Sequence, residues 1–259
     1  MRHFTLLVLF LVSCAASLRA QGNYEVQVYS SELVPKNVTM VELHSNFTPN
    51  GMKQTIDGVL PTNHAVHETV EITHGFSEWF ECGFYIFTTI QTEGPQTGWI
   101  YVGSHIRPRF AVPEKYHLPV GLSISNEIGY QRPEISLDTW TWEIRPIIDK
   151  QIARWYFSFN PAFDKSLHGL NASQGFVFSP NAKVSYDFTN KVTGGIEYYG
   201  SLGPATGFLP GPQQQQQIFP AVDLNVSPKW EINFGVGVGL THSTDHLIAK
   251  TIIGYRFDF

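Results

Sequence analysis

The chain has 259 residues, which suffice for one large domain or two small ones. Its formal net charge is -5 and no stripe of Lys and Arg stands out, so nothing indicates a nucleic-acid partner. Aromatic residues make up 14%, charged residues only 15%, and the mean hydropathy is -0.10. This average does not exclude a membrane barrel, because strands that face lipid on one side and water on the other average to near zero.

Residues 1–20 have the pattern of a secretory signal peptide. A short basic start precedes an apolar run over 4–12, and small residues follow it. A run this short cannot span a bilayer as a helix, which needs about 20 residues. We expect cleavage after Ala20. The alternative is a lipoprotein-type cleavage box that would leave a lipidated Cys14 as the first residue.

Residues 21–37 are expected to form a periplasmic lead-in. The stretch 24–30 alternates between polar and apolar residues, so it is also a candidate for a thirteenth strand. The sequence leaves open whether 21–37 enters or plugs the domain that follows.

From about residue 38 onward, apolar and polar residues alternate in long runs separated by turn clusters. The expected strands cover 38–47, 64–73, 78–90, 98–112, 117–130, 135–148, 151–163, 175–187, 192–203, 217–226, 229–241 and 246–259. Strands of a soluble sandwich usually have about five or six residues, and these are about twice as long. The sequence therefore predicts an all-β fold: a single transmembrane antiparallel up-and-down β-barrel of about 12 strands over 38–259.

The connections between these strands alternate in length. With the C-terminus in the periplasm, the short turns near 75–77, 149–150, 189–191 and 227–229 fall on the periplasmic side. The longer loops near 48–63, 164–174 and 204–217 fall outside, and the loop near 131–134 is a short exception. Outer-membrane barrels have this asymmetry. It predicts an even strand count and two periplasmic termini.

The leader, the long strands and the ending Tyr255-Arg256-Phe257-Asp258-Phe259 together carry a resemblance. The chain resembles bacterial outer-membrane β-barrels. This resemblance implies a Gram-negative outer-membrane location, outer-membrane lipid as a partner, and recognition of the segment ending at Phe259 by the barrel assembly machinery.

A second similarity is looser. The turn patterns Thr73-His74-Gly75-Phe76-Ser77 and Glu81-Cys82-Gly83 are similar to those of barrels grouped as transporters of aromatic-degradation pathways. That similarity covers turn motifs only, and it implies passage of small organic molecules.

Alternation also sorts the strand residues by face. Nearly every charged residue falls on the predicted lumen side, since a charge near the middle of the lipid face costs roughly 2–4 kcal/mol. The predicted lipid side includes Phe84, Val102 and Ile106, and Glu68 is an exception on that side. Acid and base alternate around part of the predicted wall. The candidates for a constriction are Glu71, Glu81, Arg107, Arg109, Glu143, Arg145 and Arg154.

Two interpretations of these seven residues remain open. They form a network of ion pairs that fills a modest lumen, or they form a constriction whose arginine face selects anionic or carboxylated solutes.

Histidines and serines give no sign of a metal or of catalysis. His44, His67 and His105 are expected on neighbouring strands, but no HxxxH-type spacing among these three supports a metal site, and we expect neither a metal nor a cofactor. His44-Ser45 and His242-Ser243 are adjacent pairs, so the two side chains of each point to opposite faces of a strand. A G-x-S-x-G motif does not occur in the sequence. We therefore expect no catalytic residues and no enzyme activity.

The sequence thus predicts a channel or transporter for small solutes, anionic or aromatic, with no nucleic-acid partner. The alternative is a closed structural barrel whose outer loops serve adhesion or partner binding.

Overall fold

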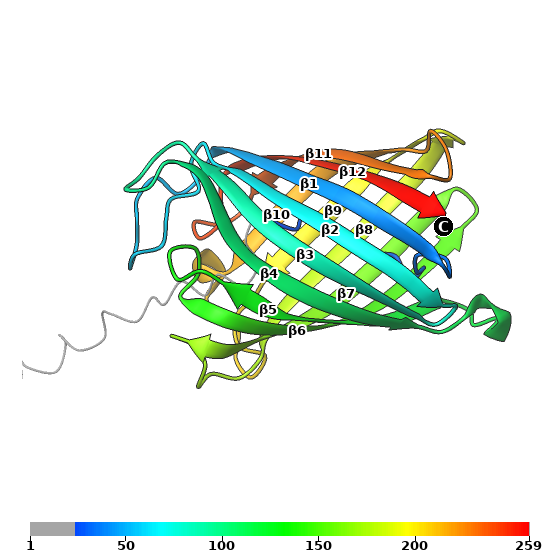
Figure 1. Cartoon of the computed structure of the whole chain (residues 1–259), viewed down its shortest axis with the longest axis horizontal. Coiled ribbons are helices and arrows are strands. Elements are labelled where there is room, and N and C mark those ends of the chain that lie inside the picture. The colour runs from blue at the N-terminus through cyan, green and yellow to red at the C-terminus, as the bar shows by residue number, and fades with distance from the viewer. Residues whose placement is uncertain (1–23, 259) are drawn as a thin grey trace, which may run out of the picture.

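Twelve long strands with alternating side chains form one closed antiparallel sheet in the structure, a computed structural model that describes residues 24–258 (Figure 1). The strands are β1 (Val38–Asn50), β2 (Val66–Ser77), β3 (Phe80–Gln91), β4 (Gly98–Ala111), β5 (Gly121–Gln131), β6 (Asp138–Ile152), β7 (Trp155–Gly169), β8 (Val177–Thr189), β9 (Val192–Ser201), β10 (Gln215–Leu224), β11 (Trp230–Gly239) and β12 (Leu247–Asp258). Each strand pairs with its neighbours in the chain, and β1 pairs with β12. The predicted 12-strand up-and-down barrel is confirmed. The predicted signal peptide and Phe259 lie outside the described residues.

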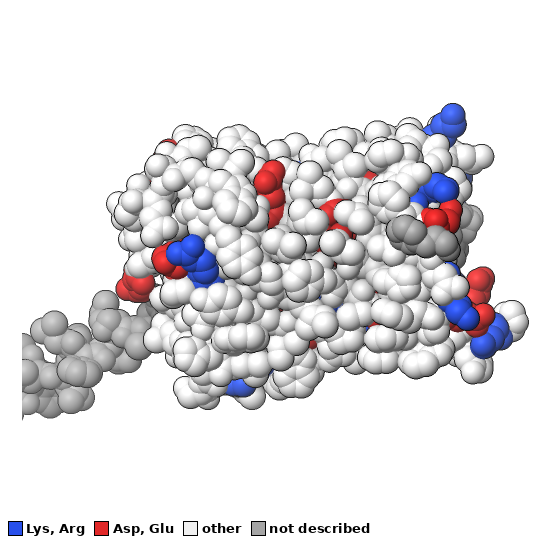
Figure 2. All heavy atoms as spheres, in the orientation of Figure 1, with Lys and Arg blue, Asp and Glu red and all other residues white. Residues whose placement is uncertain are grey.

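Apolar side chains cover the outside of the barrel. Leu43, Ile72, Phe84, Ile106 and Ile128 are all exposed on strand positions that face outward. Figure 2 shows that most of the visible side of the barrel is uncharged, with Lys and Arg near its two ends and a few Asp or Glu groups nearer the middle. A polar exception lies where the sequence placed it: Glu68 is half-buried on the outward face of β2, between Ser45 on β1 and Thr88 on β3. Among the described residues, none of the helices has the length and apolarity to cross a membrane.

The connections define two ends of the barrel. The loop end carries 51–65, 92–97, 132–137, 170–176, 202–214 and 240–246, and the turn end carries 78–79, 112–120, 153–154, 190–191 and 225–229. The connection 112–120 is a long exception at the turn end, and it contains the 3-10 helix η1 (Glu114–Tyr116). The C-terminus lies at the turn end (Figure 1). The sequence predicts that this end faces the periplasm, and that orientation stays a prediction.

Three local predictions are wrong. The turn expected at 75–77 lies at 78–79, because β2 runs to Ser77. Val102 was placed on the lipid face, but it is fully buried, because a bulge on β4 adds one residue opposite Phe87 and Thr88 and turns Val102 inward. The turn expected at 149–150 lies at 153–154 instead, where Ala153 adopts a left-handed φ of 53°. The β-strand propensity of the apolar Ile152 extends β6 beyond the polar pair that suggested the turn.

The N-terminal segment 24–34 lies inside the barrel, contrary to the expectation of a periplasmic lead-in. Tyr24, Glu25, Val26, Val28 and Tyr29 are buried, and Tyr24 contacts His67 and Phe87 in the loop-end half of the lumen. The chain then runs to the turn end, where the amide of Asn37 donates to the carbonyl of Gly75. The described chain therefore begins inside the lumen, and the prediction of two periplasmic termini stays a prediction. We call residues 24–34 the plug segment.

The backbone of the plug segment is hydrogen-bonded by side chains of the barrel wall rather than by a neighbouring strand. The carbonyl of Tyr29 accepts from Ser158 Oγ (2.7 Å) and Asn160 Nδ2 (3.1 Å), and its amide donates to Asn160 Oδ1 (2.8 Å). Both the amide and the hydroxyl of Ser31 donate to Asp149 at 2.7 Å. The backbone polar groups of an unpaired chain need such partners away from water. The charged, hydroxyl and amide residues inside the wall supply them.

Candidate functional site

Four of the seven predicted constriction residues meet in one buried cluster. Arg107 on β4 donates to Glu71 on β2 (2.5 Å) and to Glu81 on β3 (3.3 Å). Arg109 lies 3.5 Å from the same Glu81 oxygen and donates to the carbonyls of Ser30 and Glu32 in the plug segment. The amide of Val34 donates to the other oxygen of Glu81 (2.6 Å). The cluster therefore pairs two arginines with two glutamates, and it also binds the backbone of the plug segment.

Glu143 and Arg145 form a separate pair on β6. Arg145 donates to both oxygens of Glu143, at 2.7 and 2.8 Å, and is 1% exposed. Arg154 does not join these residues. It lies exposed in the turn 153–154 and donates to the carbonyl of Phe188, because β6 continues further than the sequence suggests. Six of the seven candidates are thus inside the barrel, and Arg154 as a lumen residue is a correction.

The two groups come together around Tyr29 of the plug segment. The guanidinium carbons of Arg107, Arg109 and Arg145 lie 4.9, 5.6 and 5.0 Å from the centre of the Tyr29 ring. Cations at such distances are attracted to the face of an aromatic ring. The Tyr29 hydroxyl donates to the carboxylate of Glu25 and lies 3.1 Å from the hydroxyl of Tyr85. An aromatic ring and a carboxylate of the chain itself thus occupy the arginine side of the lumen.

A second charged network lies on strands β8 to β10 and β12. Lys183 on β8 lies 3.2 Å from Glu197 on β9 and 2.8 Å from Asp223 on β10. Lys250 on β12 pairs with Glu197 and donates to the carbonyl of Val26 at 3.1 Å. Alternation places these residues inside the barrel, but the sequence gives no signal that they meet one another or the plug segment.

Between the plug segment and the outer loops lies a cavity of about 150 Å³. Its charged lining is mainly acidic: Glu25, Glu127, Asp138, Glu143 and Asp164 against Arg145 and Lys165. Of the three arginines around Tyr29, Arg145 lines this cavity, whereas Arg107 and Arg109 do not.

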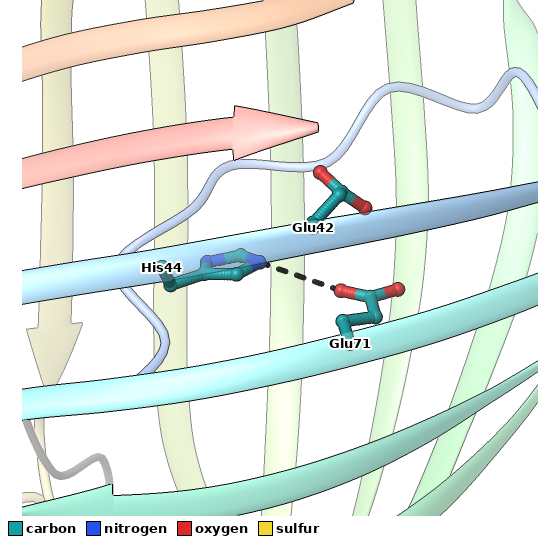
Figure 3. Close-up of side chains that lie close together, drawn as sticks. All are labelled: Glu42, His44 and Glu71. Atoms are coloured by element: carbon teal, nitrogen blue, oxygen red, sulfur yellow. Dashed lines mark ion pairs between the residues drawn. The ribbon is translucent and has the colours of Figure 1, made fainter. Parts of the chain in front are cut away.

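The three inward histidines of the first strands do not converge. His67 packs edge-on against Tyr24 at 4.8 Å between ring centres, and His105 lies 2.5 Å from Glu127. His44 lies instead with two carboxylates, Glu42 and Glu71 (Figure 3).

No family model matches the sequence, and no curated protein does either. Solved structures are nevertheless similar over most of the chain. An outer-membrane channel from Pseudomonas putida F1 has a TM-score of 0.60 at 9% identity, covering 90% of this chain and 100% of the channel. The KdgM porin has a TM-score of 0.53 at 10% identity, covering 84% of this chain and 99% of the porin. The NanC porin has a TM-score of 0.53 at 8% identity, covering 85% of this chain and 100% of the porin. The chain therefore has the fold of outer-membrane β-barrels, as the sequence predicts.

Proposed function

We propose that the protein is an outer-membrane channel for small solutes, closed in this structure by its own plug segment. One observation carries the proposal: the sheet is complete without residues 24–34, which are held in the lumen mainly by side-chain contacts. Release of the segment breaks no strand pairing. It leaves a lumen lined with charged and polar side chains, which suits the passage of water and polar solutes.

We infer the solute class from the two groups of the plug segment that lie against the arginines. The Tyr29 ring and the Glu25 carboxylate occupy the space faced by Arg107, Arg109 and Arg145. A small aromatic carboxylate offers the same two groups, a π face for the guanidinium planes and a carboxylate for their N–H donors. We therefore propose small carboxylated, preferably aromatic, solutes.

The alternative is a closed structural barrel with outer loops for adhesion or partner binding. A barrel with that role needs only wall side chains to fill its lumen, whereas here a separate segment does so. The proposal involves no catalysis, and phospholipid turnover by the purified protein would contradict it. Outer-membrane lipid is the proposed partner of the apolar belt, the exposed apolar side chains on the outward face of the barrel. Recognition of the segment ending at Phe259 by the barrel assembly machinery remains a prediction.

Planar-bilayer conductance tests the proposal, with a reversible disulfide that fixes the plug segment to the barrel wall. In a Cys82→Ser background, Ser31→Cys and Asp149→Cys replace two side chains that contact each other at 2.7 Å. The oxidised variant is expected to stay closed and to conduct after reduction. A variant that lacks residues 24–34 is expected to conduct steadily, with benzoate reducing the current more than a neutral aromatic does. A sealed bilayer at all voltages for the deletion variant, despite heat-modifiable gel mobility of the folded barrel, would refute the channel.

A further inference from the structure

Strand pairing brings two carboxylates and an imidazole together at one point of the lumen wall. Glu42 on β1 is the direct cross-strand partner of Glu71 on β2, and His44 follows Glu42 two residues later on the same inward face. One ligand atom from each residue lies within 4.8 Å of the other two. Figure 3 shows the His44 ring edge directed toward the Glu71 carboxylate, with the dashed line marking their ion pair, and the Glu42 carboxylate close by on β1.

These groups are buried, and several of their polar atoms lack partners. Glu42, His44 and Glu71 are 5%, 0% and 1% exposed. Within residues 24–258, Glu42 Oε1, Glu71 Oε2 and both ring nitrogens of His44 have no hydrogen-bond partner, and the 3.5 Å contact between His44 Nε2 and Glu71 Oε2 is an ion pair only when His44 is protonated. Buried polar groups are nearly always paired with protein, water or an ion, because leaving them unpaired costs free energy. An occupant between the three side chains is therefore expected.

We propose that Glu42, His44 and Glu71 bind one divalent transition-metal ion of the Zn²⁺ type. Zn²⁺ takes carboxylate oxygen and imidazole nitrogen at roughly 2.0–2.2 Å in tetrahedral geometry, which puts two ligands roughly 3.3–3.6 Å apart. His44 Nε2 and Glu71 Oε2 are 3.5 Å apart. The flexible Glu42 side chain completes the set. The imidazole argues against Ca²⁺ and Mg²⁺, which prefer oxygen ligands alone.

Neighbouring side chains already hold Glu71 in the required orientation. Its Oε1 accepts from Arg107 Nη2 (2.5 Å) and from Thr73 Oγ1 (2.6 Å), so Oε2 is left directed toward His44. Hydrogen bonds to the second oxygen of a ligating carboxylate are typical of metal sites and fix the ligand. A bound ion would link β1 to β2 inside the lumen. The inference does not depend on channel activity.

Metal titration of the full chain in detergent tests the site. The protein is stripped with a chelator, and Zn²⁺ alone is titrated by calorimetry. One ion per chain is expected to bind with a dissociation constant in the micromolar range or below. Glu42→Gln and His44→Gln are each expected to weaken binding at least about tenfold, because each removes a ligand. His67→Gln is the matched control, since His67 is also buried with both ring nitrogens unpartnered but lies outside the cluster.

X-ray absorption at the zinc edge of the unsubstituted chain gives a readout that needs no variant. One imidazole and two or more oxygens at about 2.0–2.1 Å are expected. Absence of Zn²⁺ binding by the folded chain overturns the proposal and leaves water or a protonated His44 between the carboxylates. Equal affinity in Glu42→Gln, His44→Gln and the unsubstituted chain also overturns it, as does a spectrum with several imidazoles, which would indicate surface histidines.

Discussion

The ring centre of Tyr29 lies 5.0 Å from the guanidinium carbon of Arg145, although one residue belongs to the plug segment and the other to the wall. Since Arg107 and Arg109 approach the same ring, Tyr29→Ala is expected to loosen the plug segment. Each such contact contributes about 0.5–2 kcal/mol. The predicted result is a higher open probability in planar bilayers. Tyr29→Phe retains the ring and should stay mostly closed, and equal gating in both variants would argue against the contact.

Arg107 neutralises two buried carboxylates, Glu71 and Glu81. Arg107→Met leaves both without their shared partner, and a broken buried ion pair costs about 3–5 kcal/mol. Urea unfolding in detergent, followed by tryptophan fluorescence, should show this loss. Arg132→Met is the control, because Arg132 pairs with Glu134 in a partly exposed loop and such pairs contribute about 0–1 kcal/mol. Similar losses in the two variants would contradict the role of Arg107.

Gly237 on β11 provides the space for the Phe219 ring on β10. A Cβ atom at Gly237 would lie 2.1 Å from the Phe219 ring. Gly237→Val is expected to cost about 1–3 kcal/mol by overpacking, measured as a lower temperature of the heat-modifiable gel shift. Adding Phe219→Ala should recover part of that loss. Gly207→Val, in a loop where a Cβ meets nothing within 4 Å, should leave the shift unchanged.

Ile106 is 48% exposed on the outward face of β4, beside Phe84 on β3. Ile106→Arg places a charge in the apolar belt and is expected to lower the free energy of unfolding in lipid bilayers by about 2–4 kcal/mol. Gln96→Arg, in the loop 92–97, should have little effect because that position is exposed at the loop end. If the two variants unfold alike, the belt does not face lipid at β4.

Glu78 in the turn 78–79 accepts a hydrogen bond from Lys115 (2.8 Å), which lowers the pKa of its carboxyl. A lowered acid pKa means that the pair favours the fold above the ordinary pKa and that this contribution is lost as the pH falls through the lowered value. Lys115→Met should therefore raise the Glu78 pKa, measured by carboxyl NMR titration in micelles. Lys150→Met removes another lysine near the turn end and should leave the Glu78 pKa unchanged.

The sequence by itself determined the barrel, its strands and the two faces of each strand. Period-two alternation places Phe84 toward lipid and Glu81 toward the lumen, because the two surroundings of the wall differ so strongly in their cost for a charge. It also located the loop-end connections near 51–65, 132–137, 170–176 and 202–214. It failed at Val102 and Arg154, where a single bulge and a longer strand changed the side chain's direction.

Only the tertiary structure decided which inward residues meet. Glu71 and Arg107 lie on strands separated by β3, and Glu42 meets Glu71 through the pairing register of β1 and β2. Such contacts depend on strand stagger and barrel closure, which alternation along one strand does not encode. The place of the plug segment depends on the same closure. Its backbone partners come from strands far apart in the chain, and they surround one lumen only after β1 has paired with β12.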